Sequence, residues 1–289
     1  MEKESVDKSI WRIFFEGLKI YCFNFHKFVL YMLFPVFGQL LGMLLVFGLL
    51  HVYSEKLPAL IKQYPVFDDF TTIVLCALLL VVPGLLIFTK AFLDFLVAYG
   101  ALNSMADAAT TINKVYDFKS HTQLITRKSF SFMGLWFLFG IFTAAALFPL
   151  FWVPGLILFI YFILIFQVFT FENDLSPVGC FKRSYQLIQG NFARTSLLAV
   201  ILGIFTYYLL PLGVSVVFAD ANLTPFLDSM FNSWIATLPL EPVYRYIPAA
   251  AIVGMLVNSF ISFIVVGMTL PLRSICWSLW YKNVCMQKL

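Results

Sequence analysis

Six long runs of apolar residues, separated by polar segments, make up most of this chain. Each run is long enough, at about 1.5 Å per helical residue, to approach or cross a hydrocarbon layer about 30 Å thick. The pattern predicts an all-α integral membrane protein with six transmembrane helices in a single membrane domain, residues 1–289. The predicted spans are residues 28–50, 71–102, 130–148, 154–171, 195–218 and 248–272.

Three polar segments share a second pattern, in which an amphipathic stretch is followed by a small polar residue, a phenylalanine and an apolar run. These stretches are residues 9–23, 122–128 and 176–189, of which the second is the weakest match. The repeat predicts three helical hairpins, each preceded by an amphipathic interface helix. Such a helix either lies in the membrane interface or docks on the ends of the other helices, and the pattern leaves both alternatives open.

The third amphipathic stretch has the clearest helix signals. Ser176 suits the N-cap, Pro177 the first helical position and Gly190 the C-terminal stop. The predicted apolar face of this helix comprises Val178, Phe181, Tyr185 and Ile188.

Composition and charge support the membrane class and orient the chain. Hydrophobic residues make up 61% of the chain and charged residues only 12%, against about 25% charged in a typical soluble domain. Fifteen of the 19 lysines and arginines lie at the two ends and in alternate loops, and three lie in the remaining loops. The positive-inside rule then predicts that both termini are cytoplasmic. The net charge of +4 is explained by anionic lipid beside these loops, so we expect no nucleic-acid partner.

One segment of about 23 residues, from Glu172 to Arg194, resembles a recurrent element of a bacterial membrane superfamily. It is similar to the membrane domain of glycerophosphoryl diester phosphodiesterases and to related families of unknown function. The residues that match are Glu172, Ser176, Pro177, Arg183, Ser184, Gly190, Asn191 and Arg194. The resemblance implies a multi-pass protein of the plasma (inner) membrane. The soluble phosphodiesterase domain of that family is absent here, so no catalytic residue is implied.

Lys90 and Asp94 are the most unusual residues of the apolar runs. They are four residues apart on the predicted second helix and within reach of each other. Charges inside a membrane are costly, which makes this pair a candidate functional site. The structural alternative, which we favour, places Lys90 about 20 residues into the span, where it reaches the inner headgroups and pairs with Asp94.

A second candidate site is a charged rim on the cytoplasmic side, comprising Glu172, Asp174, Lys182, Arg183 and Arg194. The acidic residues end the fourth span and are expected to pair with the arginines. The basic residues are candidates for binding a lipid phosphate. Simple anchoring by the positive-inside rule explains the same residues and is the favoured interpretation.

No catalytic, cofactor or metal motif is visible. His26, His51 and His121 are far apart, and the chain has no phosphate-binding loop, dinucleotide-binding glycine pattern or zinc-protease motif. We therefore expect no cofactor and no metal, and an enzyme is the less favoured class. The leading hypothesis is a non-enzymatic membrane accessory or scaffold protein that organises membrane lipid or a partner protein, which includes a second copy of the chain.

Two other functions stay open. A small transporter or channel would use a polar path near Lys90, Asp94 and Glu172. A lipid-phosphodiester enzyme is suggested by the family resemblance alone.

Overall fold

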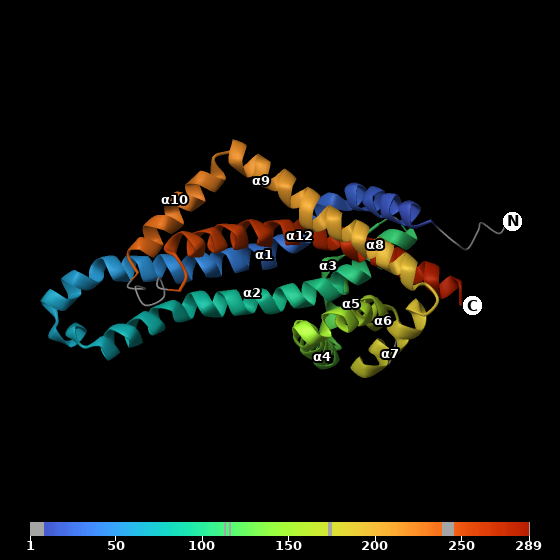
Figure 1. Cartoon of the computed structure of the whole chain (residues 1–289), viewed down its shortest axis with the longest axis horizontal. Helices are drawn as coiled ribbons and strands as arrows, with labels where there is room; N and C mark the ends of the chain where they lie inside the picture. Colours follow the sequence, from blue (N-terminus) through green and yellow to red (C-terminus); the bar gives the residue numbers. More distant parts are fainter. Residues whose placement is uncertain (1–8, 113, 116, 173–174, 239–245, 289) are drawn as a thin grey trace. The chain divides into compact units, whose positions relative to one another are not determined.

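The computed structural model describes residues 9–112, 114–115, 117–172, 175–238 and 246–288, and every regular element in this part of the chain is a helix (Figure 1). Among the described residues, six segments are long and apolar enough to cross a membrane. They are Ile10–Gln63 (α1), Phe70–Ile112 (α2), Ser129–Ala146 (α4), Pro149–Phe171, Phe192–Asp220 and Ala249–Met286 (α12). The predicted all-helical class and the six candidate spans are therefore confirmed, whereas the hairpin arrangement and the orientation stay predictions.

Two of these segments contain more than one helix. Pro149–Phe171 contains α5 (Trp152–Tyr161) and α6 (Ile165–Phe171), and Phe192–Asp220 contains α8 (Phe192–Ile204), a π-helical turn (Phe205–Leu209) and α9 (Leu210–Asp220). Three shorter helices complete the described set: α3 (Phe118–Thr126), α7 (Pro177–Ile188) and α10 (Leu223–Ala236).

The first helix differs from the prediction of an amphipathic helix followed by a separate span. α1 is continuous over 54 residues, so the stretch 9–23 and the predicted span 28–50 belong mostly to one helix. The polar residue expected to separate them, Asn24, is buried and donates from Nδ2 to the Ile20 carbonyl at 3.2 Å. Because its side chain bonds within the helix, Asn24 does not end it.

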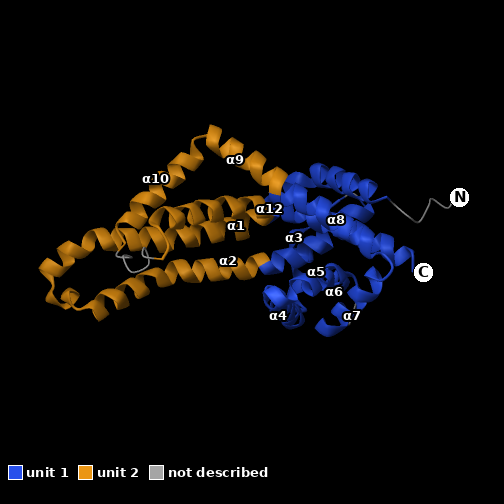
Figure 2. Cartoon of the chain, in the orientation of Figure 1, with its two compact units in different colours: residues 1–31, 96–207, 268–289 blue, residues 32–95, 208–267 orange. Residues whose placement is uncertain are grey.

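The chain forms two compact units, each assembled from segments that are distant in sequence (Figure 2). Unit 1 comprises residues 1–31, 96–207 and 268–289, and unit 2 comprises residues 32–95 and 208–267. The long helices α1, α2 and α12 each contribute residues to both units. The prediction of a single membrane domain stays a prediction.

Close backbone packing joins α1 to α2 within unit 2. A Cβ atom added to Gly42 would lie 2.7 Å from the backbone nitrogen of Phe88, and one added to Gly84 would lie 2.9 Å from the backbone nitrogen of Val46. Glycine at these positions lets the helices approach until their backbones touch. Gly38 lies four residues before Gly42, so α1 carries a Gly-x-x-x-Gly pattern that the sequence interpretation did not identify.

An apolar core completes unit 2. Leu227, Phe231 and Ile235 occur at four-residue spacing on α10 and are buried in one cluster with Met43 of α1 and Val257 of α12. This spacing places the three side chains along one face of α10, so the helix is fixed to α1 and α12 by a single apolar stripe.

Unit 1 has an aromatic core. The Phe166 ring of α6 lies edge-on to Tyr99 of α2, with centroids 4.8 Å apart, and 4.6 Å from Trp136 of α4. Phe132 of α4 also contacts Phe166. Aromatic contacts of this kind add roughly 0.5–1.5 kcal/mol each beyond the apolar area that they bury. The core therefore brings α6 beside α4, next to the segments that form the candidate site.

Candidate functional site

Helix α7 begins and ends at the residues that its sequence signals indicate. The Ser176 hydroxyl accepts a hydrogen bond from the Gly179 amide at 3.1 Å, and Pro177 occupies the first helical position. Gly190 follows the helix with a φ of +89°, a conformation that is strained for a residue with a side chain. These features set the length of α7 and therefore the height of Arg183 along it.

The helix docks on unit 1 through a different face from the one predicted. The buried residues are Cys180, Ser184, Leu187 and Ile188, whereas Val178 and Tyr185 are exposed. The prediction was wrong at these two positions because it ranked residues by hydrophobicity alone. Ser184 is buried because its hydroxyl donates to the Tyr161 carbonyl at 2.8 Å, which satisfies its polar group. The docking alternative therefore holds in the structure for this helix.

Glu172, directly after α6, is the centre of a charged cluster. Its carboxylate accepts hydrogen bonds from Arg183 Nε at 2.8 and 3.0 Å and from the Tyr281 hydroxyl at 2.8 Å. The hydrogen bond from Arg183 to this carboxylate raises the pKa of the guanidinium above its ordinary value. The cluster thus connects α7 with the end of α12 through one partly buried carboxylate.

The other residues of the predicted rim are not all in this cluster. Lys182 is exposed on α7, and Arg194 lies in the first turn of α8. Asn191 donates from Nδ2 to Gln287 Oε1 at 3.0 Å, an interaction with the end of α12. Asp174 lies outside the described residues. The structure therefore brings together Glu172 and Arg183, whereas a single five-residue rim is not seen in the part it describes.

The Lys90–Asp94 pair is in unit 2. Lys90 Nζ lies 2.6 Å from Asp94 Oδ2, and the two side chains are 75% and 53% exposed. Both therefore point away from the interior of unit 2 and neutralise each other on its surface. This geometry agrees with the structural interpretation of the pair.

A third polar group ties the C-terminal part of α12 to α2 within unit 1. Lys282 Nζ lies 2.7 Å from Asp107 Oδ1 and donates to the Thr110 and Thr111 hydroxyls at 2.8 and 2.7 Å. Sequence reasoning missed this contact because the partners are more than 170 residues apart. Its direct partners are all accounted for, so we interpret it as structural.

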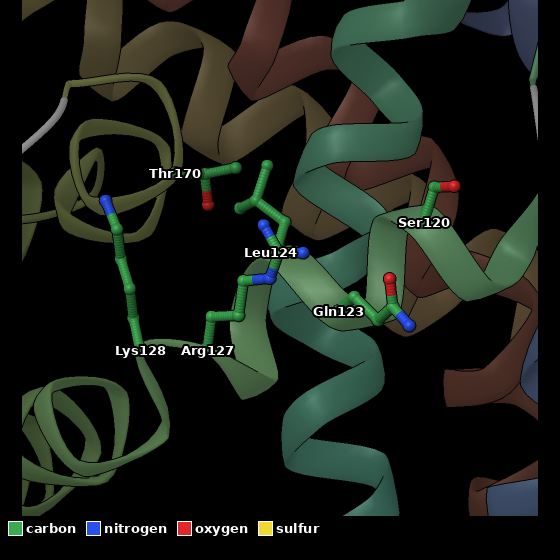
Figure 3. Close-up of a pocket in the computed structure, with 6 residues that line it drawn as sticks. All are labelled: Ser120, Gln123, Leu124, Arg127, Lys128 and Thr170. Carbon is green, nitrogen blue, oxygen red and sulfur yellow. The ribbon is translucent and has the colours of Figure 1, made fainter.

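The most open polar site of unit 1 is a cavity of about 430 Å³ beside α3 (Figure 3). Its described lining residues are Ser120, Gln123, Leu124, Arg127, Lys128 and Thr170. Four of them, from Ser120 to Arg127, follow the spacing of one helix face, and Thr170 comes from α6. We refer to this site as the α3 cavity.

The α3 cavity is positively charged. Arg127 and Lys128 are both cationic, and none of its described lining residues is acidic. Arg127 is exposed at the C-terminal end of α3, where the negative end of the helix dipole stabilises a cation. The Arg127 guanidinium forms no ion pair with another described residue, so its hydrogen-bond donors are available to an anion.

The thiol of Cys180 on α7 reports the charges around this region. Burial raises the pKa of Cys180 to about 11, the Glu172 carboxylate adds to the increase, and the positive charge of Lys128 opposes it. Lys128 therefore lies near α7 as well as lining the cavity. A thiol with so high a pKa is protonated at neutral pH and is a poor nucleophile.

Two other cavities of unit 1 have different chemistry. One, about 730 Å³, lies beside the N-terminal part of α1 and is lined by both Glu16 and Lys19. The other, about 330 Å³, is almost entirely apolar and lies between α4 and α5, beside Phe142 and Trp152. Neither collects two cations, and the α3 cavity is therefore the better candidate for a charged ligand.

The chemistry available in the α3 cavity is that of anion binding. An arginine, a lysine, an amide and two hydroxyls donate hydrogen bonds, and Arg in particular matches the geometry of phosphate. Among the described residues no group of His, Cys, Asp and Glu is suited to hold a metal ion. The sequence analysis counted Arg127 and Lys128 only as part of the positive charge bias, although the helical spacing from Ser120 to Arg127 was a usable signal.

Comparisons of this chain with protein-family models, with curated proteins and with solved structures find no match. The resemblance to the membrane domain of glycerophosphoryl diester phosphodiesterases therefore stays a prediction from the segment 172–194.

Proposed function

We propose that this chain is a non-enzymatic, multi-pass membrane accessory protein that binds anionic phospholipids through the α3 cavity. The observation that carries the proposal is the pairing of Arg127 and Lys128 in one open cavity with no acidic residue in its described lining. Two positive charges in a cavity attract one negatively charged headgroup more strongly than scattered charges do, because the donors converge on one position.

The predicted topology supports the choice of ligand. The cavity residues 120–128 belong to a loop that the positive-inside rule assigns to the cytoplasmic side of the plasma membrane. Anionic lipids give that leaflet a negative surface potential, and a basic residue near it gains about 1 kcal/mol. A cavity between α3 and the end of α6 lies beside a predicted membrane span, so a lipid headgroup is a closer ligand than a solute.

The proposal is tested by native mass spectrometry of the purified full-length protein in detergent, titrated with phosphatidylglycerol or phosphatidylcholine. We expect the wild type to retain phosphatidylglycerol preferentially. In the double variant Arg127→Gln/Lys128→Gln this preference should fall about tenfold or more, since each cation contributes about 1 kcal/mol.

The matched control is Lys114→Gln/Lys119→Gln, which removes the same charge from the same loop without changing a described lining residue. If both double variants lose binding equally, the effect is general charge attraction and the cavity is not the site. If the wild type does not distinguish the two lipids, the proposal is wrong.

The transporter alternative gains no specific support. Lys90 and Asp94 are exposed and paired with each other, and the Glu172 carboxylate is occupied by Arg183 and Tyr281. A path that carries a polar solute requires polar groups with unsatisfied bonding capacity along it. The lipid-phosphodiester enzyme rests on the family resemblance alone and has no further observation in its favour.

A further inference from the structure

We infer that the α3 cavity selects phosphodiester headgroups that carry hydroxyl groups, such as glycerol or inositol, over anionic headgroups without them. This inference rests on the proposed function and names the class of ligand for the same site. It depends on the size of the cavity, on which hydrogen-bonding roles its side chains still have available, and on its charge.

The cavity is larger than a phosphate group requires. Its volume is about 430 Å³, whereas a phosphate has five heavy atoms and takes roughly the space of two or three waters at about 30 Å³ each. A ligand that fills the site therefore extends well beyond its phosphate. The remaining lining, apart from Leu124, is polar, so the additional part of the ligand is expected to be polar too.

Thr170 offers the cavity an acceptor and no donor. Its hydroxyl donates to the Phe166 carbonyl at 2.8 Å, within α6. The proton of this hydroxyl is therefore committed, and only the lone pairs of its oxygen are left for a ligand. A phosphate oxygen accepts hydrogen bonds and cannot use an acceptor, so Thr170 matches a part of the ligand that carries a donor.

Gln123 and Ser120 add groups of mixed character. An amide and a hydroxyl both donate and accept, which is also true of an alcohol. Neither side chain forms a hydrogen bond with another described residue, and both lie on the cavity-lining face of α3. Figure 3 shows Ser120 and Gln123 toward one side of the cavity, Lys128 on the other, and Arg127 and Leu124 between them. The cavity thus has a cationic part and a neutral polar part.

The donor that Thr170 matches is an alcohol and not an ammonium group. Ethanolamine and serine headgroups also carry N–H donors, but their ammonium charge would be repelled by Arg127 and Lys128 without a carboxylate among the described lining residues to offset it. A hydroxyl group supplies the donor without the charge. The phosphate is then placed at Arg127 and Lys128, and the hydroxyls at Thr170, Gln123 and Ser120.

The test compares phosphatidylglycerol with phosphatidylethanol, two phosphodiester lipids of equal charge that differ in their headgroup hydroxyls. Binding of each to the full-length protein is measured by native mass spectrometry. We expect the wild type to bind phosphatidylglycerol about fivefold more tightly. Thr170→Val and Gln123→Leu should each bring this ratio toward one while phosphatidylethanol binding is unchanged, whereas Arg127→Gln should weaken both lipids.

Thr126→Val is the matched control, because the Thr126 hydroxyl also donates to a backbone carbonyl, that of Gln123, but does not line the cavity. It should leave the ratio at the wild-type value. A thermal melt of each variant shows whether it is folded, and the two independent substitutions at positions 170 and 123 keep the test decisive if one is not.

The outcomes separate the two proposals. Equal binding of both anionic lipids, above phosphatidylcholine, overturns the hydroxyl selectivity and leaves the proposed function in place. Binding of neither overturns both. A third arm adds glycerol 3-phosphate: failure to displace phosphatidylglycerol supports a lipid as the source of the headgroup, and displacement at comparable concentration would assign the cavity to a free phosphate ester instead.

Discussion

At the scale of single residues, the structure shows how polar groups are satisfied in a chain with few of them. Asn24 and Ser184 are buried because each donates to a backbone carbonyl. Glu172 is partly buried because Arg183 and Tyr281 both donate to it. Burial of a polar side chain was therefore decided by the presence of a partner and not by its hydrophobicity rank.

The Glu172 cluster leads to a prediction about stability. Glu172→Gln removes the negative charge opposite Arg183, and we expect it to lower the free energy of unfolding by about 1 kcal/mol, a figure reduced for the partial exposure of Arg183. The measurement is thermal unfolding in detergent. Arg183→Gln added to Glu172→Gln should cost little more, because the interaction is already lost. An additive effect of the two substitutions would contradict this account.

His121 gives a prediction about pH. Burial lowers its pKa from the ordinary value of about 6.5, although the charges of Asp117 and Asp107 partly oppose this. The folded protein therefore favours the neutral imidazole, whose Nδ1 pairs with the Ser104 hydroxyl at 2.9 Å. Stability should be complete above about pH 6.5 and should fall as the pH decreases below it, because the unfolded chain binds the proton more readily.

The measurement is the midpoint of thermal unfolding between pH 8 and pH 5.5. His121→Gln should flatten this dependence, whereas His26→Gln, at an exposed position, should leave the wild-type slope unchanged. An unchanged slope in His121→Gln would show that another group is responsible.

At the scale of elements, helix boundaries followed local signals and helix contacts did not. Ser176 and Gly190 delimit α7 through capping and a positive φ, both of which are properties of the local backbone. The docking face of α7 departed from the apolar pattern because Val178 and Tyr185 have no space in unit 1 that the smaller Cys180 and Ser184 fill. The shape of the neighbouring helices therefore decides which face is buried.

The contact between α1 and α2 gives a prediction at this scale. Gly42→Ala places a Cβ 2.7 Å from the backbone of Phe88, so the two helices must separate, and we expect a loss of about 1–3 kcal/mol in stability. Gly140→Ala is the matched control, since a Cβ there meets nothing within 4 Å and alanine favours the helix. Thermal unfolding measures both. Equal midpoints for the two variants would mean that the close approach is unimportant.

At the scale of the whole molecule, charge and units are the organising features. The segments rich in Lys and Arg before residue 32, between residues 103 and 128 and after residue 272 all belong to unit 1. The loop 51–70, which carries only two basic residues, belongs to unit 2. The three-dimensional grouping thus follows the charge bias from which the N-in, C-in orientation is predicted.

This orientation is testable with single cysteines in a chain whose five native cysteines are replaced by serine or alanine. We expect a membrane-impermeant maleimide to label Val66→Cys in intact cells, and to label Lys114→Cys only after the membrane is made permeable. Both positions are exposed, so accessibility does not limit the reaction. The reverse pattern would invert the topology and place the α3 cavity on the outer side.

The sequence by itself determined the helical class, the six apolar spans and the ends of α7, because hydrophobic length and capping are local properties of the chain. It also supplied the charge bias. Only the tertiary structure decided that Glu172 meets Arg183 and Tyr281, that α1 and α2 touch at Gly42 and Gly84, and that Arg127 and Lys128 share a cavity with Thr170. These contacts join residues from separate helices, and they depend on how the helices pack, which no local pattern contains.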